Sequence, residues 1–185
     1  MAKAKKLRTF LWFNEDVKTV AQHYKRVFKS DFELIKKSGS SDSKAPATSY
    51  EFSVLGNHVI AFRGNGEFKF NQSVSFMIVC KDQKEINKYW NRLVEGGKPG
   101  QCGWLTDKFG VSWQVVPNNL PKLLSHKDPE TAKAIAAAFA SMSKIELAGL
   151  KIKPAKKPKV EKPAAKKKAK SAKPAEAAKE VATKK

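Results

Sequence analysis

The stretch Gln101–Pro117, QCGWLTDKFGVSWQVVP, decides the fold predicted for this chain of 185 residues. Its composition indicates two strands joined by a turn at Asp107–Gly110, because glycine adopts positive φ angles without steric cost. Along the second strand, VSWQVV, alternate side chains point to opposite faces, so Ser112, Gln114 and Val116 share one face. A glutamine that faces inward from a central strand is typical of a pocket rather than of a purely apolar core.

Over the chain as far as Pro117, the order strand, helix, strands is predicted twice, and Gln101–Pro117 completes the second copy. The first copy begins with a strand at 9–13 and a helix at 15–28, for which Asn14 is the predicted N-cap. Three strands follow, at 32–37, 50–55 and 58–62, and a turn at Gly56-Asn57 joins the last two. The second copy comprises a strand at 74–80, a helix that starts at an Asp82–Glu85 cap and ends at Gly96-Gly97, and the two strands of Gln101–Pro117. This order predicts an α+β fold with an internal structural repeat.

The C-terminal part of the chain contains a predicted helix followed by a lysine-rich segment. Asp128-Pro129 starts a predicted helix at about 129–144, whose apolar face packs on the sheet or on a partner subunit. From Lys151 to Lys185 the chain holds 14 lysines and three glutamates, a net charge of +11 out of +20 for the whole chain. This segment has no aromatic residue and is rich in alanine and proline. We therefore predict a folded domain at 1–150 and a disordered cationic tail at 151–185.

The two cysteines, Cys80 and Cys102, lie in no metal-binding or redox spacing, and no secretory signal is evident. We therefore expect reduced thiols and a cytoplasmic protein, nucleoid-associated if the tail binds DNA. No apolar stretch reaches the roughly 20 residues of a membrane span. Cys80 ends an apolar run, which favours a buried structural thiol. A nucleophilic role for Cys102 is disfavoured, because His23 falls on a predicted outer helix and His126 in a late loop.

Four long segments carry a resemblance to a known family: FLWFNED at 10–16, SFMIVCKDQKEINKYWNRLVEGG at 75–97, GQCGWLTDKFGVSWQVVP at 100–117 and PETAKAIAAAFASMSKIEL at 129–147. On these segments the chain resembles the PhnB-like branch of the vicinal oxygen chelate superfamily, which includes glyoxalases, bleomycin-resistance proteins and dioxygenases. The resemblance implies two βαβββ modules, at about 7–64 and 74–117, that form a curved mixed sheet around a cavity. It also implies that the closing helix completes the domain and that two chains pair as a homodimer.

In the metal-using members of that superfamily, four inward positions, one on each of four strands, hold histidine and glutamate ligands. Strand register places these positions at Thr9, Ala61, Ser75 and Gln114. None of them is a histidine or a carboxylate, and neutral hydroxyl and amide groups hold divalent metals poorly. His58 would lie on the opposite face from Ala61. We therefore expect no metal centre of this type and no cofactor.

Members of this branch have also been described as ubiquinone-pathway methyltransferases, which implies a cofactor site. Such a site normally has a glycine-rich turn between a first strand and a helix. The only candidate, Arg63–Gly66, joins a strand to a polar loop, which favours a flexible turn between the modules. An enzyme of the glyoxalase, dioxygenase or methyltransferase type that uses the same pocket is the alternative to a binding protein.

The expected pocket has a mostly apolar wall with a few hydrogen-bonding groups, which is the usual composition of a small-molecule site. Its predicted residues are Thr9, Leu11, Phe13, Val59, Ala61, Ser75, Met77, Trp104, Ser112 and Gln114. The alternative is that these side chains fill the cavity and leave no room for a ligand.

The tail predicts a different kind of partner. Closely spaced lysines with intervening proline form an extended polycation that follows a phosphate backbone without reading its sequence. The lysines expected to contact DNA or RNA are Lys156, Lys157, Lys159, Lys166, Lys167, Lys168, Lys170 and Lys173. A third possibility is a nucleic-acid accessory protein whose folded domain only dimerises and so doubles the number of tails. The tail could also serve only to keep the chain in solution.

Overall fold

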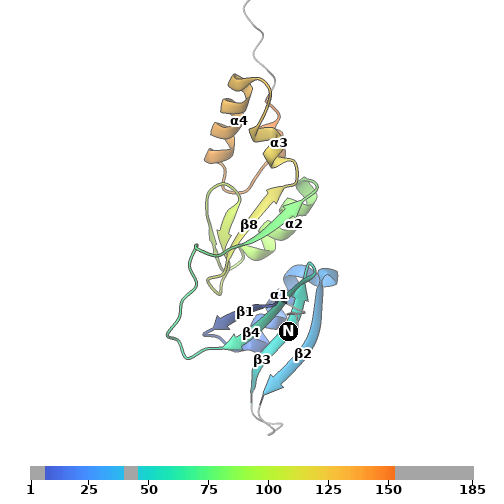
Figure 1. The fold of residues 1–185 in the computed structure, drawn as a ribbon, viewed down its shortest axis with the longest axis vertical. Coiled ribbons are helices and arrows are strands. Elements are labelled where there is room, and N and C mark those ends of the chain that lie inside the picture. The colour runs from blue at the N-terminus through green and yellow to red at the C-terminus, as the bar shows by residue number, and fades with distance from the viewer. Residues whose placement is uncertain (1–6, 40–45, 153–185) are drawn as a thin grey trace, which may run out of the picture. The chain divides into compact units, whose positions relative to one another are not determined.

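The computed structural model describes residues 7–39 and 46–152 (Figure 1). These residues form two four-stranded mixed sheets with helices, so the predicted α+β class is confirmed. The predicted tail, apart from Lys151 and Ile152, and its lysines from Lys156 to Lys173 lie outside the described residues. In the part of the chain that is described, no helix combines the length and the hydropathy needed to cross a membrane.

The first module contains one complete sheet and one helix. Its elements are β1 (Thr9–Phe13), α1 (Val17–Phe28), the 3₁₀ turn η1 (Lys29–Asp31), β2 (Phe32–Gly39), β3 (Ala47–Val54) and β4 (Asn57–Arg63). The strand order is β1-β4-β3-β2, in which β1 and β4 are parallel and the other pairs are antiparallel.

The second module repeats this topology. Its elements are β5 (Phe76–Cys80), α2 (Gln83–Leu93), β6 (Lys98–Pro99), β7 (Trp104–Thr106) and β8 (Ser112–Pro117). The strand order is β5-β8-β7-β6, again with the first and last strands of the module parallel. The matching strand orders confirm the internal repeat that the order of elements predicts.

In the first module, one helix cap and one turn lie at residues other than those predicted. The N-cap of α1 is Asp16 rather than Asn14, because the Asp16 carboxylate accepts a hydrogen bond from the Thr19 N–H at 3.3 Å. The hairpin between β3 and β4 turns at Leu55 and Gly56, whose φ angles are 49° and 80°. Two central residues with positive φ match the twist of the flanking strands, so the turn begins one residue earlier than predicted.

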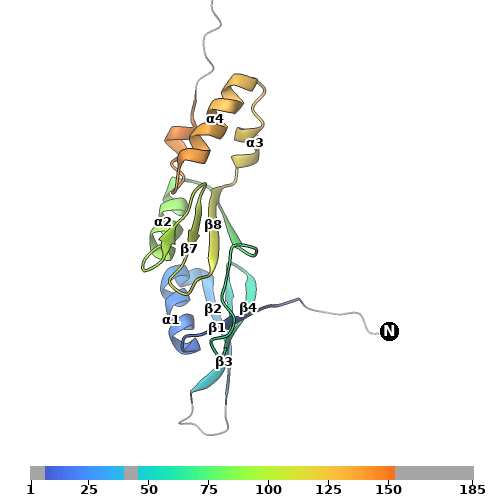
Figure 2. The same ribbon diagram turned by 90° about the vertical axis from the view of Figure 1, so that its left-hand side faces the viewer.

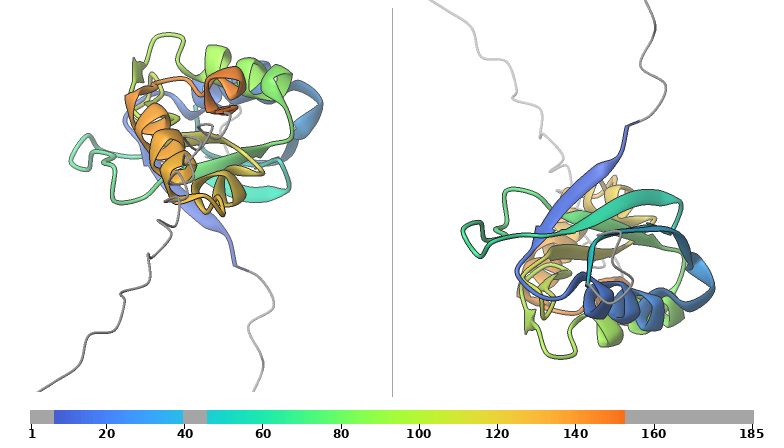
Figure 3. Two further views of the ribbon diagram at one scale, coloured as in Figure 1. Left: turned by 90° about the horizontal axis from the view of Figure 1, so that it is seen from above. Right: turned by 90° about the horizontal axis from the view of Figure 1, so that it is seen from below.

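Each helix packs on one face of its own sheet. In Figure 2, α1 and α2 lie on the same side, and the strands of both modules lie on the other. The right-hand view of Figure 3 shows α1, in dark blue, along one face of the first sheet. The core lies between helices and sheets, where Phe13, Val20, Phe52, Leu93 and Val115 are fully buried or nearly so. The opposite face of the two sheets, which we call the open face, is left without a helix from either module.

The C-terminal segment packs on the second module. It comprises α3 (Leu120–Leu124), α4 (Pro129–Ser141) and the 3₁₀ turn η2 (Leu147–Leu150), so the closing helix ends three residues before the predicted position 144. The N–H groups of Cys102 and Gly103 donate to the carbonyls of Met142 and Ser143. The Gln83 side chain bonds the backbone on either side of Glu146, at Ile145 and Leu147. These bonds hold the chain against α2 and the turn before β7.

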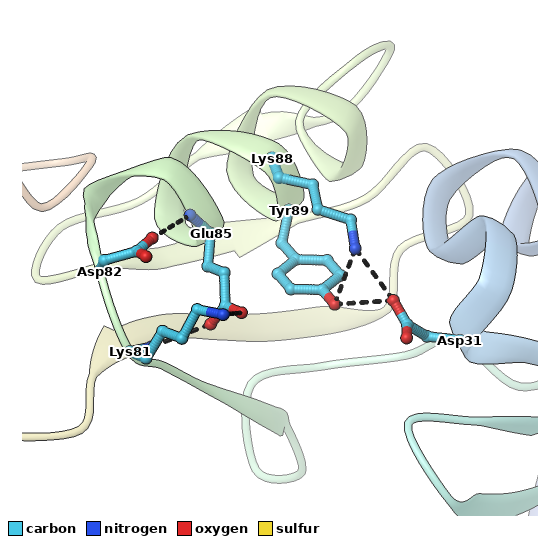
Figure 4. A network of polar contacts seen from close by, with 6 residues as sticks. All are labelled: Asp31, Lys81, Asp82, Glu85, Lys88 and Tyr89. Atoms are coloured by element: carbon cyan, nitrogen blue, oxygen red, sulfur yellow. Dashed lines mark hydrogen bonds and ion pairs between the residues drawn. The ribbon is translucent and has the colours of Figure 1, made fainter.

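Polar contacts also join the two modules. The Tyr24 hydroxyl on α1 donates to buried Asp107 in the turn between β7 and β8. On the same side, Lys88 and Tyr89 extend from α2 to the carboxylate of Asp31 in η1 (Figure 4), at 2.9 and 3.0 Å. The hydrogen bond from Lys88 is the main reason that the pKa of Asp31 lies below its ordinary value. Both contacts fix α1 and its following turn against the second module.

Candidate ligand-binding site

The open face carries large apolar side chains that reach solvent. Phe10 and Trp12 on β1 are 50% and 43% exposed, and Met77 and Val79 on β5 are 56% and 59% exposed. A monomeric protein rarely leaves a contiguous apolar surface of this kind uncovered unless it binds something. The open face is therefore the surface where a ligand or a second chain has the most apolar area to cover.

On the first sheet, aromatic rings form a continuous group across the open face. The ring centroids of Trp12 and Phe62 are 5.0 Å apart, those of Phe10 and Phe62 are 5.5 Å apart, and Phe68 stands edge-on to Trp12 at 5.8 Å. Rings at these separations stack in tilted or T-shaped pairs. Together they offer an apolar platform of tilted rings.

Beside this platform lies a small polar cluster. Glu51 on β3 accepts from Arg8 at 3.3 Å, and its Oε2 lies 3.2 Å from Nε2 of His58 on β4. The sequence prediction placed His58 away from the pocket, yet the structure places it on the open face with Glu51. Both contacts use Oε2 of Glu51, so its other carboxylate oxygen is left to accept from a polar ligand group.

The second sheet contributes the predicted polar pair. The Gln114 side-chain amide on β8 donates to the Ser75 hydroxyl at 2.8 Å. Strand register places Met77 and Trp104 opposite Gln114, so these side chains share the open face with it. The structure therefore brings together four of the ten predicted pocket residues. A fifth, Ser112, is buried and donates to the Asn71 carbonyl at 3.3 Å.

A shallow hollow lies where the two modules meet. Its volume is about 160 Å³, and its wall includes Ser75 and Met77 from the second module and Leu55 and Asn57 from the turn between β3 and β4. Ligand sites for small molecules usually enclose about 300–1,000 Å³. The hollow is thus an incomplete site, with room for part of a small molecule.

The other predicted pocket residues lie on the opposite side of the first sheet. Thr9, Leu11 and Phe13 share a face with Val59 and Ala61, and that face packs on α1. This corrects the predicted register by one residue on β1 and β4. A void of about 10 Å³, bordered by Leu11 and Val59, lies inside the sheet, and it is at the lower limit for a single water molecule.

The corrected register also changes the positions relevant to a metal. Thr9 and Ala61 face the core, whereas Ser75 and Gln114 are on the open face as predicted. Within residues 7–39 and 46–152, no three histidine, cysteine, aspartate or glutamate side chains gather closely enough to hold one metal ion. Glu51 and His58 lie together but bond to each other.

The two cysteines and His23, which were weighed as a nucleophile and its base, lie in different environments. Cys80 is buried, and burial raises the pKa of its thiol to about 12, so it stays protonated. Cys102 adopts a left-handed φ of 57° at the turn before β7. His23, which was expected on an outer helix, lies on α1 and is only 4% exposed. Burial, with smaller contributions from Lys108 and Arg26, lowers the pKa of His23 to about 4.

Comparison with solved structures finds one that shares this fold and others that are more distant. A PhnB protein from Bacillus cereus, described as a 3-demethylubiquinone-9 3-methyltransferase, superposes with a TM-score of 0.55 at 24% identity and covers 61% of this chain and 99% of its own. Protein PA1353 from Pseudomonas aeruginosa gives a TM-score of 0.49 at 18% identity, covering 62% and 98%. The fosfomycin resistance protein FosX from Listeria monocytogenes, solved with Mn(II) and sulfate, gives 0.44 at 17% identity, covering 62% and 92%.

Sequence comparison adds the family. A search of curated proteins gives no match. The family model described as 3-demethylubiquinone-9 3-methyltransferase matches residues 5–116, which is more than half of the chain and includes both modules. The chain therefore belongs to the 3-demethylubiquinone-9 3-methyltransferase family.

Proposed function

We propose that this protein binds a small, partly apolar molecule on the open face, at the junction of its two modules. The observation that carries the proposal is the hydrogen bond from Gln114 to Ser75, because Ser75 lines the hollow between the modules together with exposed Met77. A hydroxyl and an amide within an apolar surface orient a ligand, and the surrounding apolar area supplies affinity. The expected metal-free character of the site rests on the neutral donors Ser75 and Gln114.

A second copy of the chain would complete this site. The hollow alone is about 160 Å³, and Phe10, Trp12, Met77 and Val79 on the open face stay exposed in a single chain. A symmetric dimer that brings two open faces together buries these side chains and closes the hollow from the other side. We therefore propose a homodimer in which the open faces approach each other.

Binding rather than methyl transfer is the function that this geometry supports. Arg63–Gly66 follows β4, and its Gly64 N–H donates to the Phe13 carbonyl at 2.7 Å, so this glycine-rich segment caps the end of a strand. It does not open a helix, as the phosphate-binding turn of a nucleotide-type cofactor site does. An enzyme that acts on the ligand in the same place is the second candidate, and it requires turnover that depends on Gln114.

Native mass spectrometry of the full-length chain, purified without added metal, tests the proposal. We expect a dimer that carries an additional small mass, and Gln114→Ala and Ser75→Ala should lose that mass while remaining folded. Gln101→Ala, at an exposed glutamine outside the site, serves as the control and should retain it. A metal-bearing wild-type chain would overturn the metal-free proposal, and a dimer without any added mass would remove the support for a ligand.

We also propose that the tail binds nucleic acid without sequence preference. The support comes from composition: 14 lysines against three glutamates between Lys151 and Lys185, with no aromatic residue for base stacking. Pairing of two chains would place two tails on one particle and raise their avidity.

A further inference from the structure

A second cavity lies on the helix side of the molecule, away from the open face. It has a volume of about 490 Å³ and lies where the C-terminal ends of α1 and α2 meet the turn between β7 and β8. His23 and Arg26 come from α1, Arg92 and Glu95 come from α2 and the segment after it, and Lys108 comes from the turn. This volume lies within the range of about 300–1,000 Å³ that small-molecule sites occupy.

The backbone on the α2 side of this cavity is held closely against the turn. A Cβ atom on Gly97 would lie 2.1 Å from the Thr106 carbonyl oxygen, and Gly96 takes a φ of 75° beside Lys108. Asp107 fixes the turn itself, because its carboxylate accepts from the N–H groups of Phe109 and Val111 at 2.9 and 3.0 Å. Lys108 is therefore presented from a rigid segment, which lowers the cost of ordering it around a ligand.

The cavity wall is strongly cationic. Arg26, Arg92 and Lys108 bring three positive charges against the single negative charge of Glu95. Neither Arg26 nor Lys108 forms an ion pair with another described residue, and Arg92 uses one guanidinium nitrogen to donate to the Val27 carbonyl at 2.9 Å. The formal sum of +2, with a neutral histidine, matches a dianion. Guanidinium groups bind tetrahedral oxyanions through paired N–H donors.

His23 provides an independent observation, because one of its ring nitrogens lacks a hydrogen-bond partner among the described residues. Its ring is 4% exposed and stands edge-on to Phe109 at 5.2 Å, yet its Nε2 has no hydrogen-bond partner among the described residues. Buried polar atoms are nearly always paired in folded proteins. A ring nitrogen left without a partner beside a cationic cavity is the feature expected of a group that pairs with a ligand.

We propose that this cavity binds a small molecule through a phosphate group. Arg26, Arg92 and Lys108 contact the phosphate oxygens, and His23 lies in the wall beside them. Glu95, the one carboxylate in the wall, accepts from a hydroxyl or amine elsewhere on the same ligand and repels a second anion. This site is separate from the open face, so it is independent of the function proposed above.

The experiment follows the ring signals of His23 by NMR in the full-length chain, titrated with inorganic phosphate near pH 7 while sodium chloride holds the ionic strength constant. The His23→Asn spectrum assigns the signals. We expect a saturable shift of the His23 signals and a rise of the His23 pKa at saturation, because the bound anion offsets the positive charges of Lys108 and Arg26. His58 and His126, which lie outside the cavity, report any effect of phosphate on the tail or the solvent.

Matched variants make the assignment specific. Arg26→Gln and Lys108→Gln, both at exposed side chains, should each weaken phosphate binding about tenfold, as the loss of a charge-assisted contact predicts. Arg26→Lys keeps the charge and should recover part of the affinity. Lys18→Gln on α1 and Lys98→Gln on β6 remove the same charge outside the cavity and should stay within about twofold of the wild-type chain.

Three results would overturn the proposal. One is a shift of His23 that rises linearly without saturation, as simple ionic screening would give. Another is equal phosphate affinity in the wild-type chain, Arg26→Gln and Lys108→Gln. The third is an equal His23 shift with a short DNA oligonucleotide, which would make the phosphate source a nucleic acid backbone rather than a small molecule.

Discussion

Tyr24 on α1 donates a hydrogen bond of 2.8 Å to Asp107, which lies 83 residues later in the turn between β7 and β8. Asp107 also accepts from the Trp113 indole at 2.9 Å and from two backbone N–H groups of its own turn. Burial raises the pKa of the Asp107 carboxyl, and these four donors oppose that effect. One buried carboxylate thus ties the first helix to the last strand of the repeat.

Tyr24→Phe removes one donor from this buried carboxylate and leaves the ring packing intact. We expect the free energy of unfolding to fall by about 1.5–3 kcal/mol, the range for a hydrogen bond to a charged group. Urea denaturation measures the change. Tyr50→Phe is the matched control, because Tyr50 is buried and its hydroxyl forms no hydrogen bond with a described residue. Equal losses in both variants would show that the Tyr24–Asp107 bond contributes nothing of its own.

The contact of Asp31 with Lys88 and Tyr89 predicts a pH dependence of stability. The pKa of Asp31 is lowered by its hydrogen bonds, so its contribution is present above the ordinary carboxyl pKa of 3.8 and is lost as the pH falls through the lower folded value. Asp31→Asn should therefore cost up to about 1 kcal/mol near neutral pH, as for a half-exposed pair. The difference from the wild-type chain should shrink toward zero in acid, as chemical denaturation across the pH range would measure.

Lys88→Met provides the second arm of that experiment. It should lower stability near neutral pH by a similar amount, and combining it with Asp31→Asn should cost less than the sum of the two single variants. A difference between the wild-type chain and Asp31→Asn that stays constant down to acid pH would contradict the linkage.

Gly97→Ala tests the close packing of the segment after α2. The added Cβ would meet the Thr106 carbonyl oxygen at 2.1 Å and the Asp107 backbone at 2.9 Å, so the turn must shift. We expect a loss of about 2 kcal/mol or more in the free energy of unfolding. Gly64→Ala is the control, because its nearest neighbour would be at 3.4 Å, and it should stay within about 0.5 kcal/mol. Similar effects at both glycines would argue against the steric explanation.

Met77→Arg tests the proposed pairing of open faces. Two arginines brought together in a symmetric interface repel each other and lose apolar contact, so we expect the dimer dissociation constant to rise at least about tenfold. Sedimentation velocity of the full-length chain measures it. Leu124→Arg, at another exposed apolar residue on α3, should leave the dimer intact. Loss of the dimer in Leu124→Arg but not in Met77→Arg would place the interface elsewhere.

The tail proposal predicts a steep salt dependence of DNA binding. If half of the 14 lysines between Lys151 and Lys185 neutralise phosphates, the slope of log K against log salt should be about −6. A chain that ends at Ile152 should bind far more weakly and with a shallower slope. Fluorescence anisotropy with a short duplex measures both. A chain in which the tail lysines are replaced by glutamine separates charge from length, and undiminished binding by that chain would contradict the proposal.

The sequence identifies the open face on the second sheet because polar residues mark it. In β8, Ser112 and Gln114 alternate with Trp113 and Val115, so only one register buries the apolar set. The parallel pairing with β5 then places Met77 beside Gln114, as predicted.

The same reasoning fails on the first sheet for a physical reason. The strand TFLWF is apolar at almost every position, and HVIAF on β4 has apolar residues at both alternations. Either face could therefore be buried. The choice depends on α1, whose Tyr24 and Val27 pack against the face that carries Phe13 and Phe52. His23 could not be placed for a related reason, since the second module, not the helix pattern, buries it against Phe109.

The aromatic cluster around Tyr24 draws on both copies of the repeat. Its ring contacts Phe28 and Phe52 from the first module and Phe109 and Trp113 from the second. A fragment with either copy alone would leave half of this cluster in water and Asp107 or Tyr24 without its partner. The duplication that is visible in the strand order therefore does not create two independent folding units. We expect the two halves to gain and lose their structure in one cooperative step, and substitutions in this cluster to be energetically coupled between the halves.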